Sequence, residues 1–283
     1  MASQEAAAGA MERTIYLIRH AESRYNEAKK AWNLRGLVGE RDHSLSSTGF
    51  VQCARLRSAL QCAAASGDAD AIAILSRKKT LSSPLCRALL TAHFALPHSD
   101  QASPEIVAIS QAREQCMMPV FARDSVGTPR DEINAKVASE LSALNHSKEK
   151  YSTAGEDTAS APHLTKAPVV DVSKIEEETW WRVGETGEST SNRLQELLEF
   201  LYNEAEGSGT SGYGGIILVA HSRIIRSLFR LFSNESQFSE KLVENCAVIR
   251  LALSSHTELD NTADGRTSVH IRNAEFLFNS GFR

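Results

Sequence analysis

Two apolar segments of the chain end directly in a histidine. TIYLI at 14–18 is followed by Arg19 and His20, and GIILVA at 215–220 is followed by His221. Both segments are short and rich in β-branched residues, which favours buried strands. In open, largely parallel sheets, ligands bind beyond the carboxyl ends of the strands. If these two strands are neighbours, both imidazoles can contact one ligand.

A third segment adds another cation. In SSPLCRALLTA at 82–92, Ser83 and Pro84 predict the N-cap and the first position of a helix that runs from Pro84 toward Phe94. Arg87 then falls in the first helical turn. Two guanidiniums, two imidazoles and a helix N-terminus suit a phosphoryl group, because guanidinium forks and helix N–H groups both favour its charged oxygens. The sequence therefore predicts a phosphate pocket.

An imidazole in such a pocket can attack phosphorus when its lone pair is free. Arg19 and Arg87 are expected to lower the pKa of His20, because they disfavour a further positive charge and so keep the ring neutral at physiological pH. The leaving oxygen needs a proton, and Glu114, just after the apolar run at 105–109, is placed to donate it. The sequence shows neither an Asp/His metal cluster nor a Walker-type glycine loop. We therefore expect a covalent mechanism without metal or cofactor.

Apolar runs and helical periodicities alternate along the chain, which is typical of an α/β fold with a mostly parallel sheet. We expect strands at 14–18, 71–75, 105–109, 215–220 and 247–253, with an edge strand at 268–272. Three segments repeat apolar residues at helical spacing, and Ser46 or Ser47 is placed to cap the first of them. These residues are Phe50, Cys53, Leu56 and Leu60; Leu194, Leu197, Leu198 and Leu201; and Ile224, Ile225, Leu228, Phe229 and Phe232.

The chain is expected to form a single domain over residues 13–283, preceded by a flexible N-terminal tail at 1–12. Residues 147–168 contain only two large apolar side chains, Tyr151 and Leu164. Such a segment cannot bury enough surface to offset its ordering entropy. We therefore predict a flexible insertion there.

Composition narrows the class of protein. A formal net charge of −4 and scattered basic residues argue against nucleic acid as a partner. No segment approaches the roughly 20 apolar residues of a membrane span, and the N-terminal residues do not resemble a secretory signal. Five cysteines without a C-x-x-C pair fit free thiols in a reducing compartment. We predict a cytoplasmic protein without a membrane partner, and the sequence makes no prediction of its oligomeric state.

Five motifs occur in order: RHAESRYN at 19–26, D-x-x-L-S-x-x-G at 42–49, SSPLCRALLTA at 82–92, REQ at 113–115 and VAHS at 219–222. Together they make the chain resemble the phosphoglycerate mutase-like branch of the histidine phosphatase superfamily, from Thr14 to about Leu253. ARDSVGTPRDEI, VVDVSKIEEETWWRVGETGES and VENCAVIR are similar to a plant, fungal and protist subgroup of that branch. The resemblance implies a three-layer α/β sandwich and a phosphohistidine intermediate.

The resemblance also implies a role for each motif residue: His20 is the nucleophile, Glu114 is the general acid, and the phosphate is bound by Arg19, Arg87, His221, Asn26 and Ser23. Glu114 would then serve as the base that activates water. The family most often has glycine after each histidine, whereas this chain has Ala21 and Ser222. Both side chains are small, so we expect the backbone still to approach the phosphate.

The segment after Glu114 bears on the reaction. Cofactor-dependent mutases of the family carry W-R-L-N-E-R-H-Y-G-x-L-Q-G-L-N-K around their acid, a segment that closes over the sugar acid and keeps water out. Here Glu114 is followed by QCMMPVFARDSVGTP, which does not match. We therefore predict a phosphomonoester hydrolase. A phosphoglycerate mutase-type phosphotransferase and a catalytically silent phospho-ligand binder are the alternatives, and the intact set of motif residues argues against the silent binder.

Substrate selectivity is expected to come from the segment after Glu114 and from the region of Trp180 and Trp181. Arg123 and Arg130 are candidates to meet a second anionic group. This suggests a sugar phosphate or another small phosphorylated metabolite, and a protein phosphate stays open. Tryptophans more often pack in a core than recognise a ligand.

Overall fold

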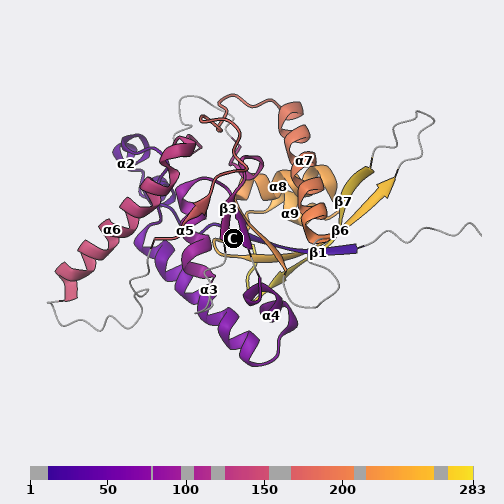
Figure 1. The fold of residues 1–283 in the computed structure, drawn as a ribbon, viewed down its shortest axis with the longest axis horizontal. Coiled ribbons are helices and arrows are strands. Elements are labelled where there is room, and N and C mark those ends of the chain that lie inside the picture. The colour runs from indigo at the N-terminus through magenta and orange to yellow at the C-terminus, as the bar shows by residue number, and fades with distance from the viewer. Residues whose placement is uncertain are drawn as a thin grey trace, which may run out of the picture.

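The computed structural model describes residues 12–77, 79–96, 105–115, 125–152, 167–206, 215–257 and 267–282. The strands of this part of the chain form one sheet in the order β4-β3-β2-β5-β1-β6-β7 (Figure 1). Pairs among β1 to β5 are parallel, and β6 and β7 are added antiparallel at the β1 side. The strands are β1 (Glu12–Arg19), β2 (Lys79–Ser82), β3 (Glu105–Ala108), β4 (Val170–Asp171), β5 (Ile216–Ala220), β6 (Val248–Thr257) and β7 (Thr267–Leu277).

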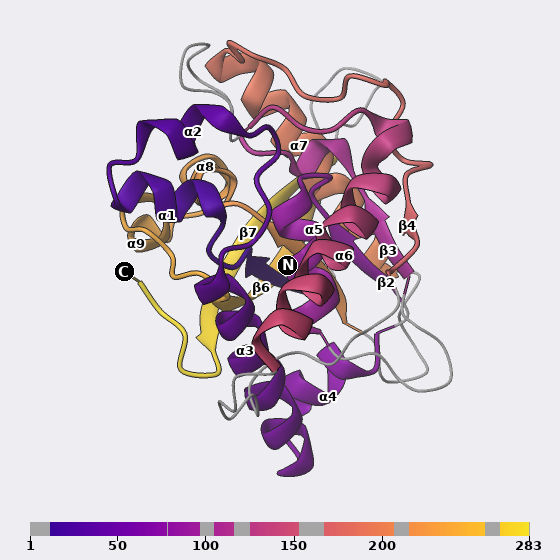
Figure 2. The ribbon, with the colours of Figure 1, turned by 90° about the vertical axis from the view of Figure 1, so that its left-hand side faces the viewer.

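Helices cover both faces of the sheet, so the expected three-layer sandwich is confirmed (Figures 1 and 2). Alternation along β1 sends Tyr16 and Ile18 into a core shared with α3 and α5, and Ile15 and Leu17 into a core shared with α7 and α8. The helices are α1 (Arg24–Lys30), α2 (Leu34–Gly39), α3 (Ser47–Ala65), α4 (Ala69–Leu75), α5 (Cys86–Ala95), α6 (Ile133–Ser152), α7 (Gly187–Glu206), α8 (Ser222–Phe232) and α9 (Ser236–Glu240), with 3₁₀ turns η1 (Ser110–Ala112) and η3 (Arg130–Glu132). In the described segments, no helix has the length and hydropathy needed to cross a membrane.

The strands expected at 14–18, 105–109, 215–220, 247–253 and 268–272 are confirmed as β1, β3, β5, β6 and β7, with β7 at the sheet edge. The strand expected at 71–75 is wrong, because these residues form α4. Asp68 caps that helix by accepting a hydrogen bond from the backbone N–H of Ala71 at 2.8 Å. Ala71 and Ile74, three residues apart, are its buried positions. The strand of this region is β2, whose sequence KTLS has one large apolar residue.

The predicted tail at 1–12 lies outside the described residues except for Glu12, which begins β1. Most of the insertion predicted at 147–168 also lies outside them. Its first residues continue α6 as far as Ser152, and the description resumes at Ala167. The described cysteines, Cys53, Cys62, Cys86 and Cys246, are free thiols.

The loop that follows β1 is packed against the start of α3. Ser46, one of the two residues predicted to cap this helix, is the N-cap of α3, and its backbone N–H donates to the carbonyl of Glu22 at 3.0 Å. Its hydroxyl also lies 3.0 Å from a carboxylate oxygen of Glu22. A Cβ at Gly49 would lie 2.1 Å from the Glu22 carbonyl oxygen, so only glycine allows this approach. The motif at 42–49 thus fixes the loop after His20.

Candidate active site

The two histidines come together because their strands are neighbours, as the sequence predicts. β1 and β5 pair in parallel, with Arg19 opposite Ala220. His20 and His221 follow the ends of these strands, and their ring centroids are 5.0 Å apart with planes at 56°. Both are buried. The pair therefore lies beneath the surface at the carboxyl edge of the sheet.

A distant loop holds the backbone of Arg19 and His20. The N–H of Arg19 donates to the carbonyl of Ala247 at 3.1 Å, and the Arg19 carbonyl accepts from the N–H of Cys246 at 3.0 Å. The side-chain amide of Asn245 donates to the carbonyl of His20 at 2.8 Å. VENCAVIR at 243–250 contains these residues, but the sequence alone does not show that they are hydrogen-bond partners of β1.

The protonation of the His20 ring follows from its contact with the backbone. Nδ1 lies 2.6 Å from the carbonyl oxygen of Ala21. A carbonyl only accepts hydrogen bonds, so Nδ1 carries the proton and Nε2 of the neutral ring keeps its lone pair. Ala21 is held in turn by Thr91, whose Oγ1 accepts from the Ala21 N–H at 3.0 Å and donates to the carbonyl of Arg87 at 2.7 Å.

Burial is the main reason that His20 stays neutral. It lowers the pKa of His20 well below its usual range, and the positive charges of Arg87 and then Arg19 lower it further. The hydrogen bond to Ala21 acts in the opposite sense. The sequence predicts the contribution of the two arginines, whereas the larger contribution of burial appears only in the folded chain.

Arg87 lies in the first turn of α5, but the predicted cap of that helix is wrong. The helix begins at Cys86 with Leu85 in the N-cap position, and the side chain of Leu85 makes no capping hydrogen bond. The Cys86 N–H donates to Oδ1 of Asp42 at 2.8 Å, and Oδ2 of Asp42 accepts from the Thr128 hydroxyl at 2.8 Å. Asp42 therefore supplies the missing acceptor from another segment. Arg87 is 2% exposed, which places its guanidinium inside the molecule.

Ser83 contacts the second histidine instead of capping α5. Its Oγ lies 2.7 Å from Nε2 of His221, whose Nδ1 is buried and has no hydrogen-bond partner among the described residues. Burial, then the charges of Arg87, His20, Arg19 and Arg193, lower the pKa of His221 well below its usual range. The hydroxyl of Ser222 is likewise buried without a partner in the described part of the chain. Nδ1 and this hydroxyl are thus available to a bound group.

Glu114 lies beyond β3 on the same edge of the sheet and is buried. Its Oε1 accepts from the N–H of Gln115 at 3.0 Å. The backbone carbonyl of Gln115 accepts from Arg223, in the first turn of α8, at 3.2 Å. The side-chain amide of Gln115 donates to the hydroxyl of Thr190 at 3.1 Å. Because α8 starts just after His221, this contact ties the segment of Glu114 to the segment of the second histidine.

Ser23 and Asn26 form the capping box of α1. Ser23 Oγ accepts from the Asn26 N–H at 3.2 Å, and Asn26 Oδ1 accepts from the Ser23 N–H at 3.3 Å. Both side chains thus stabilise the helix that follows the nucleophile loop. Their role as phosphate ligands stays a prediction.

The residues proposed for substrate selectivity differ in where the structure places them. Trp180 is buried and its indole N–H donates to the carbonyl of Thr128 at 2.9 Å, so it is mainly a packing residue. The Arg130 guanidinium contacts Asp131 at 2.8 Å and two backbone carbonyls, which makes it a structural side chain. Arg123 lies outside the described residues.

The chain is thus an α/β protein with a buried histidine and arginine centre at the carboxyl edge of its sheet. The sequence profile of the histidine phosphatase superfamily (branch 1) matches residues 15–163, just over half of the chain. The chain therefore belongs to the histidine phosphatase superfamily, whose members include phosphatases and mutases. No curated protein matches it in a sequence comparison.

Several solved structures are similar to this one. A phosphoglycerate mutase from Bacillus anthracis is 18% identical, with a TM-score of 0.48 over 93% of each chain. A mycobacterial glucosyl-3-phosphoglycerate phosphatase is 20% identical, with a TM-score of 0.43 over 94% of this chain and all of the other. The α-ribazole phosphatase of Shigella flexneri is 18% identical, with a TM-score of 0.44 over 91% of this chain and 95% of that one.

Proposed function

We propose that the protein is a phosphomonoester hydrolase that works through a phosphohistidine on His20. The observation that carries the proposal is the state of this ring. Its Nδ1 donates to the Ala21 carbonyl, and the ring is buried beside Arg19 and Arg87 and kept neutral. An unprotonated Nε2 next to two fixed guanidiniums is a nucleophile paired with the charge that a phosphoryl group needs.

The first step forms the intermediate. Arg19, Arg87 and His221 bind the phosphoryl oxygens, and Nε2 of His20 attacks phosphorus. The bond from phosphorus to the ester oxygen breaks, its electron pair stays on that oxygen, and the oxygen takes the proton of Glu114.

The second step returns the enzyme to its starting state. Water attacks phosphorus while Glu114, now a carboxylate, accepts a proton from it. The phosphorus–nitrogen bond breaks, and its electron pair restores the lone pair on Nε2 of His20. In both steps the Ser222 hydroxyl serves as a further hydrogen-bond donor to the phosphoryl group. Ser23 and Asn26 line the same pocket.

The substrate class that we propose is a small phosphorylated metabolite, and the free state of the described cysteines supports action in the cytoplasm. Family membership supports phosphoryl chemistry but leaves hydrolysis and transfer as separate outcomes. The segment after Glu114, which lacks the mutase sequence, favours hydrolysis.

A panel of phosphomonoesters tests the proposal, with release of inorganic phosphate and isomerisation of phosphoglycerate measured in parallel. We expect phosphate release from at least one member and none with His20→Ala. Isomerised ester without net phosphate release would instead identify a mutase. If wild-type protein binds members of the panel and neither hydrolyses nor isomerises any of them, it is a silent phospho-ligand binder.

A further inference from the structure

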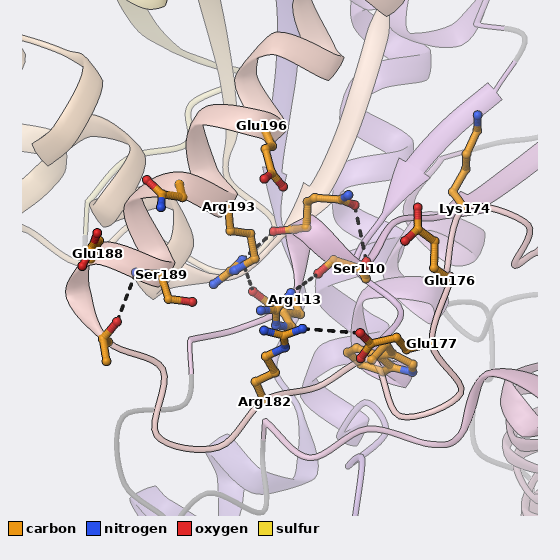
Figure 3. A pocket seen from close by; sticks show the side chains of 14 residues that line it. Ser110, Arg113, Lys174, Glu176, Glu177, Arg182, Glu188, Ser189, Arg193 and Glu196 are labelled. Carbon is orange, nitrogen blue, oxygen red and sulfur yellow. Dashed lines mark hydrogen bonds and ion pairs between the residues drawn. The ribbon is translucent and has the colours of Figure 1, made fainter.

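A second pocket lies at the carboxyl edge of β3, next to the segment that carries Glu114. Its volume is about 560 Å³, and its walls come from η1, from the segment after β4 and from the first turns of α7 (Figure 3). Charged side chains dominate the lining. His20, Arg87 and His221 are not among its lining residues, so this pocket is distinct from the phosphoryl centre.

Three arginines from three segments converge here. Arg113 donates to Oε1 of Glu185 at 2.7 Å, and Arg193 binds both oxygens of Glu185 at 2.8 and 2.7 Å. Arg182 lies near enough to Arg113 for its charge to act on that guanidinium (Figure 3). Burial, and then the positive charges of Arg193 and Arg182, lower the pKa of Arg113 to about 10. Arg113 therefore remains charged at neutral pH.

The charges at the base of the pocket do not balance. The side chains of Arg113 and Arg193 are 10% and 6% exposed, and that of Glu185, which both contact, is 1% exposed. Two largely enclosed guanidiniums therefore share one enclosed carboxylate, which leaves an excess positive charge. An enclosed charge is costly unless an opposite charge meets it. Arg182, which is 62% exposed and 3.4 Å from Glu177, can add its charge from the rim.

The rim of the pocket carries mainly carboxylates. Lys174 and four carboxylates line the opening: Glu176, Glu177, Glu188 and Glu196 (Figure 3). Carboxylates accept hydrogen bonds from hydroxyl or ammonium groups and repel a second anion. The pocket is therefore complementary to a group that is acidic at its inner end and carries hydrogen-bond donors nearer the rim.

The pocket adjoins the segment of the proposed acid through Arg113. Arg113 precedes Glu114 in the chain, and Arg193 donates to the carbonyl of Arg113 at 3.2 Å. Arg193 is also near enough to contribute to the low pKa of His221. The pocket thus adjoins the backbone segment that carries the proposed acid.

We propose that this pocket binds a second acidic group of the substrate, with Arg113 and Arg182 as its contacts. The inference rests on the proposed function and narrows it to phosphomonoesters that also carry a carboxylate or second phosphate, together with hydroxyl or amino groups. It assigns Arg113 and Arg182 to the role for which Arg123 and Arg130 are the candidates from the sequence, and the role of Arg123 stays a prediction.

Matched substrates test the proposal. ω-Phosphooxy carboxylic acids of increasing chain length are compared with alkyl phosphates of equal length, and kcat/KM is measured for each. We expect the carboxylate to raise kcat/KM at least tenfold at one optimal length, where both sites are spanned, because charge-assisted hydrogen bonds are strong. Arg182→Met should reduce this ratio by about tenfold, through a lower kcat/KM of the phosphooxy acids. Arg130→Met, a matched loss of charge outside the pocket, should keep the ratio.

Binding to His20→Ala, measured by calorimetry with the same pairs, separates this inference from the proposed function. The phosphooxy acid should bind more tightly than the alkyl phosphate of equal length, and adding Arg182→Met should abolish this difference in affinity. That result would support the pocket even if wild-type protein released no phosphate. Equal ratios with and without the Arg182→Met change, both in turnover by otherwise wild-type protein and in binding to His20→Ala, would overturn the inference. Glutarate has no phosphoryl group. If glutarate bound as tightly as the best phosphooxy acid, the pocket would be a site for a separate anion, and the inference would be overturned. Arg182 is exposed, so its replacement keeps the test independent of folding.

Discussion

The Nδ1 atom of His20 lies 2.6 Å from the backbone carbonyl oxygen of Ala21. This contact fixes which nitrogen of the ring carries the proton and turns Nε2, with its lone pair, away from the backbone that holds it. The residue after the histidine thus determines the chemistry of the histidine through its carbonyl group. Any small residue can supply that group, which explains how Ala21 can stand where the family most often has glycine.

The two buried histidines predict how stability depends on pH. Their pKa values are lowered in the folded chain, so below about pH 6.5 the unfolded chain binds protons that the folded chain does not. The free energy of unfolding should therefore fall as pH falls from 6.5, by up to about 1.4 kcal/mol per pH unit for each histidine. Denaturant titrations at pH 7.5, 6 and 5 should give a shallower decline for His20→Gln and His221→Gln. Equal slopes in wild type and both variants would show that the rings are protonated in the folded state.

Glu114→Gln should affect substrates according to their leaving groups. A poor leaving group, such as an alkoxide, needs the proton of Glu114, so its rate should fall about 10²–10⁴-fold, whereas an aryl phosphate should be slowed far less. The formation rate of the phosphoenzyme, measured in single turnovers, is the quantity to compare. Glu132→Gln, which changes an exposed carboxylate of η3, is the control. Equal slowing of both substrates would contradict the acid role.

Ser222→Ala should weaken binding of the phosphate product. The serine hydroxyl is buried and unpartnered within the described chain, so a phosphoryl oxygen is the group that we expect it to meet. Losing one such hydrogen bond should raise the competitive inhibition constant of inorganic phosphate roughly three- to tenfold. Ser227 lies on the same helix, is also buried and accepts from Arg230 at 3.2 Å, so Ser227→Ala should leave that constant unchanged. The hydroxyl would have no role in phosphate binding if the two variants behaved alike.

Asp42→Ala should destabilise the fold. The Asp42 carboxylate accepts from the N–H of Cys86 and from both the N–H and the hydroxyl of Thr128, so its removal leaves several donors without an acceptor. We expect the free energy of unfolding to fall by roughly 2–4 kcal/mol. Asp42→Asn should cost less, because the amide keeps an acceptor and asparagine tolerates the left-handed backbone at φ 51°. Thermal unfolding of the two variants tests this order, and the reverse order would show that Asp42 does not act as the cap.

The parts of the site that could be predicted from the sequence are those set by local pattern. A β-branched run that ends in histidine places His20 and His221 at the ends of strands, and the helix after Pro84 places Arg87 in its first turn. The run at 71–75 was ambiguous, since five apolar residues suit a strand or a buried helix turn. Its helix was identifiable only from the Asp68 cap.

The remaining parts depend on contacts between distant segments. Asp42 caps a helix that begins 44 residues later, and Asn245 holds the backbone of a histidine 225 residues earlier. Both residues stand in motifs of the sequence, Asp42 in D-x-x-L-S-x-x-G and Asn245 in VENCAVIR, but a motif does not show which backbone group of another element the side chain contacts. The arginines of the second pocket are similar, since Arg113, Arg182 and Arg193 come from segments that the fold brings together.

The most direct test of the account is to trap the phosphorylated enzyme. Protein mixed with a ³²P-labelled substrate and quenched within milliseconds should carry acid-labile, alkali-stable phosphate, and peptide mapping should locate it on His20. The label should be absent from His20→Ala and should disappear from wild type as inorganic phosphate forms. Turnover of the same substrate by His20→Ala at the wild-type rate, or a label on another residue, would contradict the central claim.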